Sequence, residues 1–183
     1  MAIKTFTTGE VLTAADTNTY LANSGLVFVK QQTIGTGVSS ITLSNAFSAT
    51  YDNYRVVVSG GVFSTSVPLQ FKVGPSSPAT GYYAMLIYAS YGSPVTNANV
   101  NNGSLWNWMG FGSSGGIGAT VDILSPFASK NTFCVAGTYN HVGGAGTCQG
   151  ILGNTNSYTD LIVQPEAGTA TGGIITVYGY RKE

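Results

Sequence analysis

Residues 82–89, which read YYAMLIYA, form an eight-residue stretch without glycine, proline or charge. In a β-strand, alternate side chains point to opposite faces, and here both faces would be apolar. One face would hold Tyr82, Ala84, Leu86 and Tyr88, and the other Tyr83, Met85 and Ile87. A strand with one wet face does not need this pattern. We therefore expect one face to pack on another subunit, with an aromatic ligand platform or core filling as alternatives.

Similar runs recur from Leu26 to the end of the chain. Stretches rich in Val, Ile, Thr, Tyr and Phe alternate with Gly, Ser, Asn and Pro, which is typical of strands and turns. The best candidates are residues 26–31, 39–43, 54–59, 68–73, 82–89, 104–110, 119–124, 132–139, 147–152, 160–164 and 174–180. Because no long helical pattern separates them, the strands should be mainly antiparallel. The sequence predicts an all-β fold, a jelly-roll-like β-sandwich of about ten strands over residues 26–183.

The first 25 residues have a different pattern. Thr13 and Asp16 have the spacing of a helix capping box, and no glycine or proline follows before Gly25. We predict one short helix at about residues 13–23. Its thin apolar stripe consists of Leu12, Ala15, Tyr20 and Leu21. A helix of ~10 residues with so little apolar surface is not stable alone, so residues 1–25 should dock on something.

Charge is scarce. Charged residues make up 8% of the chain, against ~25% in average proteins, and seven basic residues balance seven acidic ones. We therefore expect no nucleic-acid partner. No apolar run is long enough to cross a bilayer, so membrane insertion is not expected. Long neutral stretches instead predict contact with copies of the chain or with a partner, and a neutral sugar-binding face would have a similar composition.

Residues suited to catalysis or metal binding are few. Cys134 and Cys148 lack further Cys or His at metal-site spacing, and we expect two free, buried thiols, with a bridge between them as the alternative. His141 lies in a glycine-rich stretch, expected to be a loop, without an adjacent nucleophile. The sequence predicts no catalytic residue, no cofactor and no metal site, and hence no enzyme.

Trp106 and Trp108 lie in the predicted strand 104–110, where alternation puts both indoles on one side. Two indoles exposed to water on one face would favour association. We expect a neighbouring subunit to cover them, with a ligand or the second sheet of the domain as alternatives. If the ligand is a sugar, the residues predicted to bind it are Trp106, Trp108, Tyr88, Tyr91 and Asn107.

The opening stretch FTTGEVLTAADTNTYL, residues 6–21, resembles the N-terminal segment of small tail-fibre, tail-tip and related virion proteins of tailed bacteriophages. Residues 46–60 and 175–182 are similar to the β domains of such proteins. Within residues 46–60, a turn is expected at Asp52 and Asn53, and Arg55 is expected to pair with Asp52.

The resemblance implies a virion component, made in the host cytoplasm, that binds other virion proteins through residues 1–25. The attachment residues would be Leu12, Thr13, Asp16, Tyr20 and Leu21. The β domain that follows would form a homotrimer and contact the host surface, where a glycan is one candidate partner. The resemblance implies no catalytic residue.

Three functions follow. The first is a tail fibre or receptor-binding protein, and the second is a capsid decoration protein or head fibre built in the same way. The third is a free, lectin-like carbohydrate-binding module, which would not need the N-terminal segment. Attachment to the tail or to the head of a particle would separate the first two.

Overall fold

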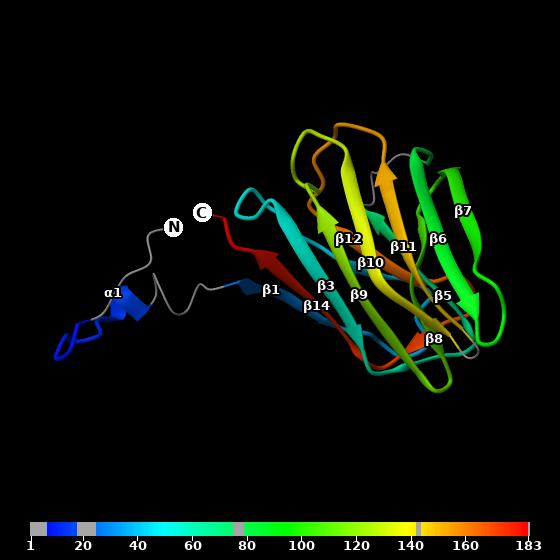
Figure 1. The fold of residues 1–183 in the computed structure, drawn as a ribbon, viewed down its shortest axis with the longest axis horizontal. Helices are drawn as coiled ribbons and strands as arrows, with labels where there is room; N and C mark the ends of the chain where they lie inside the picture. The colour runs from blue at the N-terminus through cyan, green and yellow to red at the C-terminus, as the bar shows by residue number, and fades with distance from the viewer. Residues whose placement is uncertain (1–6, 18–24, 75–78, 142–143, 183) are drawn as a thin grey trace.

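A computed structural model describes residues 7–17, 25–74, 79–141 and 144–182. Twelve strands form one continuous antiparallel sheet that folds over on itself at a hairpin and so makes two layers. The first layer has the order β1 (Leu26–Thr33), β14 (Ile174–Tyr180), β3 (Asn53–Ser59), β9 (Gly116–Leu124), β10 (Thr132–His141), β11 (Gly144–Leu152), β6 (Tyr82–Ser90) and β7 (Thr96–Gly103). The predicted all-β sandwich is confirmed (Figure 1).

The second layer is smaller. It has the order β2 (Ile41–Leu43), β12 (Leu161–Pro165), β5 (Val67–Val73) and β8 (Trp106–Ser113). A hairpin from β8 into β9 connects it to the first layer, and β4 (Val62–Phe63) pairs separately with β13 (Ala170–Thr171). All eleven predicted strands are present, whereas β4, β7 and β13 were not expected. His141 ends β10 rather than lying in a loop, which corrects that prediction.

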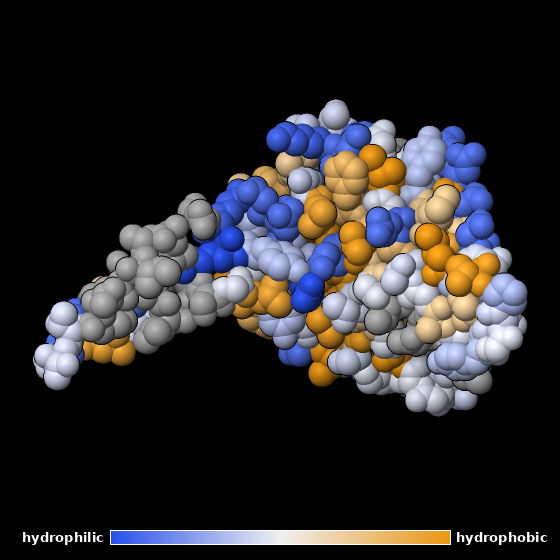
Figure 2. Space-filling view, viewed as in Figure 1, coloured by the Kyte–Doolittle hydropathy of each residue, from blue (hydrophilic) through white to orange (hydrophobic). Residues whose placement is uncertain are grey.

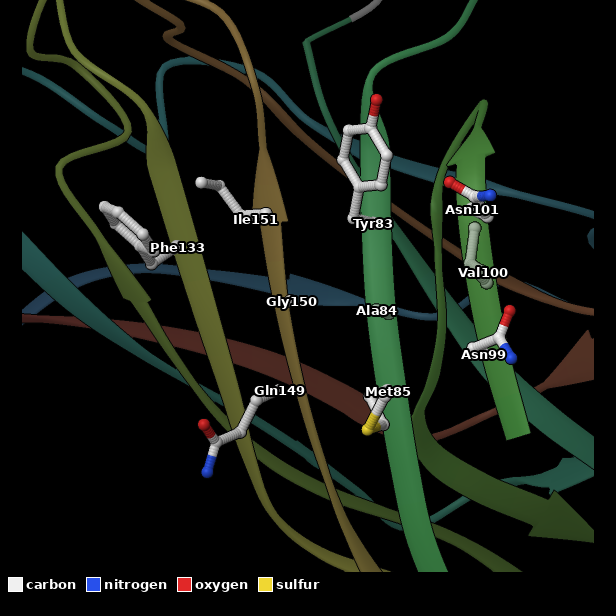
Figure 3. Close-up of a pocket in the computed structure, with 10 residues that line it drawn as sticks. All are labelled: Tyr83, Ala84, Met85, Asn99, Val100, Asn101, Phe133, Gln149, Gly150 and Ile151. Atoms are coloured by element: carbon white, nitrogen blue, oxygen red, sulfur yellow. The ribbon is translucent and has the colours of Figure 1, made fainter. Parts of the chain in front are cut away.

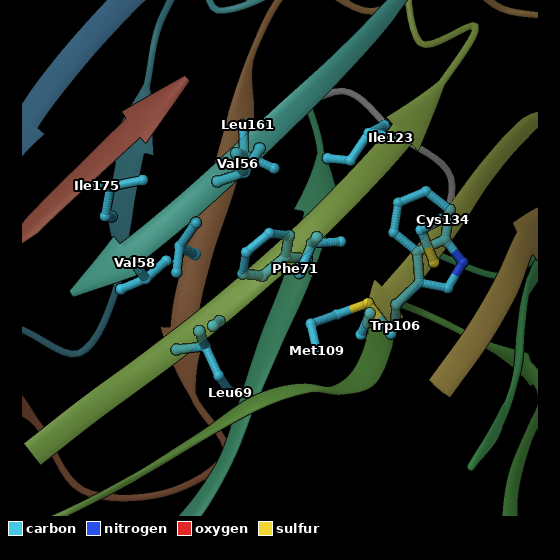
Figure 4. Close-up of a cluster of buried hydrophobic side chains, with 14 of the residues drawn as sticks. Val56, Val58, Leu69, Phe71, Trp106, Met109, Ile123, Cys134, Leu161 and Ile175 are labelled. Carbon is cyan, nitrogen blue, oxygen red and sulfur yellow. The ribbon is translucent and has the colours of Figure 1, made fainter. Parts of the chain in front are cut away.

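The core lies between the two layers. Alternate side chains of β3 and β5 point inward and are fully buried, because each strand has its apolar residues at every second position. These inward residues are Tyr54, Val56 and Val58 on β3 and Leu69, Phe71 and Val73 on β5. Figure 4 shows part of this core, with Trp106 and Met109 from the second layer beside Cys134 from the first. The opposite face of the first layer points away from this core, toward solvent.

The N-terminal segment contains α1 (Ala14–Asp16). The predicted capping box is confirmed: Asp16 N donates to Thr13 Oγ1 at 3.1 Å, and Thr13 N donates to Asp16 Oδ2 at 3.2 Å. The rest of the predicted helix, with Tyr20 and Leu21, lies outside the described residues. No residue of α1 is buried, and Figure 1 shows α1 apart from both layers, on the side of β1. In the part of the chain that is described, no helix is long and apolar enough to span a membrane.

Candidate functional site

The two tryptophans of β8 are covered by the domain's own core, Trp106 completely and Trp108 in part, which corrects the expectation that a neighbouring subunit covers both. Leu69 of β5 pairs with Gly110, and Phe71 pairs with Trp106, so residues 107–109 bulge opposite Gln70. At the bulge, Trp108 has a φ angle of +61°. Because three residues of β8 lie opposite one residue of β5, inward and outward side chains no longer alternate along β8. Trp106 is completely buried beside Tyr82, with ring centroids 5.0 Å apart, so the domain's own core covers it and no subunit or ligand can.

Asn107 is also unavailable to a ligand. Its side chain is buried, and Nδ2 donates to Glu166 Oε1 at 2.8 Å. Its Oδ1 accepts from Trp108 N at 2.9 Å, so the amide stabilises the bulge. Trp108 and Tyr88 are half-buried against the core, and Tyr91 lies exposed after the end of β6. The five residues predicted to bind sugar are thus divided among the core, the bulge and a turn, and do not form one surface.

The two apolar faces predicted for residues 82–89 are present. Tyr82, Ala84 and Leu86 point into the core. On the outer face, Tyr83, Met85 and Ile87 keep 39%, 53% and 52% of their surface exposed. Figure 2 shows apolar side chains interspersed with polar ones on the face of the molecule where Figure 1 has β6 and β10 in front. This uncovered apolar surface is a candidate contact or ligand site.

A groove of about 540 Å³ crosses this outer face over β10, β11, β6 and β7 (Figure 3). Its residues are Tyr83, Ala84, Met85, Asn99, Val100, Asn101, Phe133, Gln149, Gly150 and Ile151. Strand pairing arranges the outward side chains in two rows. One row is Phe133, Ile151 and Tyr83, and the other is Gln149, Met85 and Asn99. Because the rows are two residues apart along each strand, they are separated by about 7 Å.

The floor between the rows is low because Gly150 and Ala84 lie at inward-facing positions of their strands, so that only backbone faces outward there. A Cβ atom on Gly150 would lie 2.7 Å from Trp106 Cδ1, so the buried indole requires glycine there.

The groove is polar at its sides but carries no charge. None of its lining residues is Asp, Glu, Lys, Arg or His. The side-chain amides of Asn99, Asn101 and Gln149 make no hydrogen bond to another described residue, so their donors and acceptors are available. Sequence reasoning missed the two asparagines because it missed β7. The signal was present in Ala98 and Val100, which alternate with the asparagines and pack on the core.

A second polar cluster lies on the outer face of β3, β9 and β14. Arg55 pairs with Asp122 rather than with Asp52, because β3 and β9 are neighbours in a register that places these two residues opposite each other. Tyr180 adds a hydrogen bond from its hydroxyl to Asp122 Oδ1 at 2.7 Å. Asp52 instead forms an ion pair with Lys182 at 2.6 Å. The expected pairing of Arg55 with Asp52 was wrong.

Cys134 and Cys148 are free and buried, as expected, on the inward face of β10 and β11. Burial raises the pKa of the Cys148 thiol to about 12. The pKa of Cys134 is also raised, mainly by burial and further by Cys148. Such thiols are poor nucleophiles. Among the described residues, no three His, Cys, Asp or Glu side chains are grouped so as to hold a metal ion.

The described part of the N-terminal segment presents apolar side chains to solvent. Val11 is 79% exposed and Leu12 48% exposed, directly before the capping box of Thr13 and Asp16. Comparison with protein-family models finds no match to the chain, and a search of curated proteins finds no significant match.

Proposed function

We propose that the chain is a structural protein of a bacteriophage virion, a tail fibre or receptor-binding component. Residues 1–25 attach it to other virion proteins, and the β domain contacts the host surface. The observation that carries this proposal is the segment that precedes β1. It has a satisfied helix cap and exposed apolar side chains at Val11 and Leu12, yet no residue of α1 is buried against the domain. A partner surface would supply the missing burial.

The arrangement of the sheet supports the same assignment. The N-terminal segment leads into β1, at one edge of the first layer, and the groove lies toward β7 at the opposite edge. Figure 1 shows α1 and the C-terminal end of β14 on the β1 side. Attachment and contact surfaces are thus at opposite ends of one sheet, as a protein that bridges a particle and a cell requires. The resemblance of residues 6–21 to phage virion proteins points to the same function.

We further propose that the chain forms a homotrimer. Leu26 and Phe28 on the edge strand β1 are exposed apolar residues, and Ile174 on the neighbouring strand β14 is exposed opposite the other end of β1. A symmetric contact there would bury them and leave the groove open. Light scattering of the purified chain at micromolar concentration should give three times the mass of one chain, and a stable, soluble monomer would contradict the trimer.

The attachment role is tested by one point variant and a matched control. Leu12→Asp places a charge on the exposed apolar stripe of the N-terminal segment. Val95→Asp places the same charge on the β domain, at a residue that is 71% exposed. In phage particles assembled with each variant, we expect L12D to be lost and V95D to be retained at normal copy number. Normal incorporation of L12D would mean that the anchor lies elsewhere.

A further inference from the structure

We infer that the groove over β10, β11, β6 and β7 binds a neutral saccharide through the ring of Tyr83 and the amides of Asn99, Asn101 and Gln149. This inference deepens the proposed function, and rests on it, because it names the surface ligand that the β domain would contact. Binding itself is a property of the purified chain and is measured apart from attachment.

The groove has a form that suits a small ligand. It is shallow and open to solvent, with a volume of about 540 Å³, so it suits a ligand that keeps part of its surface hydrated, as a saccharide does. Its floor is backbone at Gly150, and its two side-chain rows come from strands of a sheet rather than from loops. The site is therefore formed before any ligand binds, which reduces the entropy lost on binding.

The residues of the groove match the chemistry of a sugar ring. A sugar ring has an apolar face of C–H groups and a rim of hydroxyl groups. Tyr83 offers an exposed aromatic ring next to Ile151, with which it pairs across the strands. The amides at the sides each offer two donors and an acceptor, and a hydroxyl both donates and accepts. Apolar contact is thus available to the ring face and hydrogen bonds to its rim.

The neutral lining of the groove favours an uncharged ligand. No charged residue lines the groove, so an anionic sugar would lose hydration without gaining a counter-charge. Arg55 lies on the same layer, but its guanidinium is already paired with Asp122. The site therefore favours neutral over sialylated or sulfated saccharides.

A second copy of the chain fits the groove less well. Packing this face on itself would bury the amides of Asn99, Asn101 and Gln149 from both copies. Each amide left without a partner costs free energy, and an apolar interface core has few groups to pair with it. Saccharide hydroxyls both donate and accept, so they provide partners for such amides directly or through bridging water.

The test uses the full chain on an array of neutral oligosaccharides, with sialylated and sulfated glycans on the same surface. We expect binding to neutral glycans. Tyr83→Ala should weaken it about tenfold or more, which corresponds to ~1.4 kcal/mol. The matched control is Tyr91→Ala, which removes a tyrosine that is 74% exposed and outside the groove, and which should bind as the wild type does.

A second pair of variants guards against a folding defect. Asn99→Ala removes an amide that lines the groove, whereas Asn97→Ala removes the preceding outward asparagine of β7, which does not. We expect weaker binding only for N99A, with unchanged melting temperatures for both.

Three outcomes would overturn the inference: no glycan binding by the wild type, binding to charged glycans only, or equal binding by Y83A and Y91A. A change of oligomeric mass in Y83A would assign the groove to a second copy. Absence of glycan binding by a wild-type chain that is incorporated normally into particles would refute this inference alone, whereas normal incorporation of L12D would refute the proposed attachment alone.

Discussion

Arg55 and Asp122 form a bidentate ion pair across β3 and β9, although 67 positions separate them in the sequence. Arg55 Nε donates to Asp122 Oδ1 at 2.8 Å and Nη2 donates to Oδ2 at 2.7 Å. The guanidinium also lies 5.6 Å from the ring centroid of Tyr180 on β14. One charged pair thus links three neighbouring strands of the first layer.

Asp122→Ala should lower the free energy of unfolding by about 1 kcal/mol, because solvent screens a pair that is about one quarter to one third exposed. Asp52→Ala breaks the more exposed pair with Lys182 and is the matched control, with little expected change. Urea unfolding of the two variants measures the difference. Equal stability of D122A and D52A would contradict the structural role of the inner pair.

The same pair predicts a dependence on pH. Burial alone would raise the pKa of Asp122, but hydrogen bonds from Arg55 and Tyr180 outweigh it and hold this pKa below its ordinary value. A carboxyl with a lowered pKa in the folded state stabilises above its unfolded pKa of about 3.9. That contribution is lost as the pH falls through the folded pKa. The stability difference between wild type and D122A should be constant at pH 5–7 and shrink below about pH 4. A difference that stays undiminished from pH 5 down to pH 2 would contradict it.

Trp106→Ala should destabilise the domain by about 3–5 kcal/mol, because it removes a fully buried indole from the contact with Tyr82. Trp108→Ala should cost less, because Trp108 is only half-buried. Thermal unfolding of both variants measures which substitution costs more stability. A folded W106A with wild-type stability would show that the indole is not part of the core.

Gly150→Ala should destabilise by about 1–3 kcal/mol, because the new methyl group would overlap the indole of Trp106 and the carbonyl oxygen of Tyr83. Gly118→Ala is the control, since no atom lies within 4 Å of the position of its Cβ. That substitution should be neutral or slightly stabilising. Chemical denaturation of both variants gives the comparison, and equal stabilities would show that the indole can move away.

Cys134 and Cys148 should be unreactive in the folded chain. Their burial and raised pKa values keep them as thiols at pH 8, so a thiol reagent should modify neither without denaturant and both with it. Fast labelling of the native protein would contradict the packing of β10 against the second layer.

The sequence predicts the strands that bury one apolar face, because each of them has apolar residues at alternate positions. It did not predict β7, which carries asparagine at most outward positions and buries only Ala98 and Val100 partly. An edge strand with a wet outer face has little apolar signal. Two of the three amides that line the groove, Asn99 and Asn101, were missed for this reason.

Two other errors arise from long-range pairing. The bulge at residues 107–109 depends on how β8 pairs with β5, and local alternation along β8 cannot show it. The partner of Arg55 depends on the register of β3 against β9, so the nearest acid in sequence was the wrong choice. By contrast, the capping box of Thr13 and Asp16 is a local feature and was predicted from its spacing.

The central claim is that residues 1–25 join the chain to a virion while the β domain projects with its groove facing outward. A reconstruction of phage particles assembled with the chain tests it most directly. We expect density for the N-terminal segment within the tail, and the β7 edge of the sandwich pointing away from the particle. A sandwich seated on the capsid would assign the chain to the head. Density that joins the particle through the groove, or particles that lack the chain, would contradict the account.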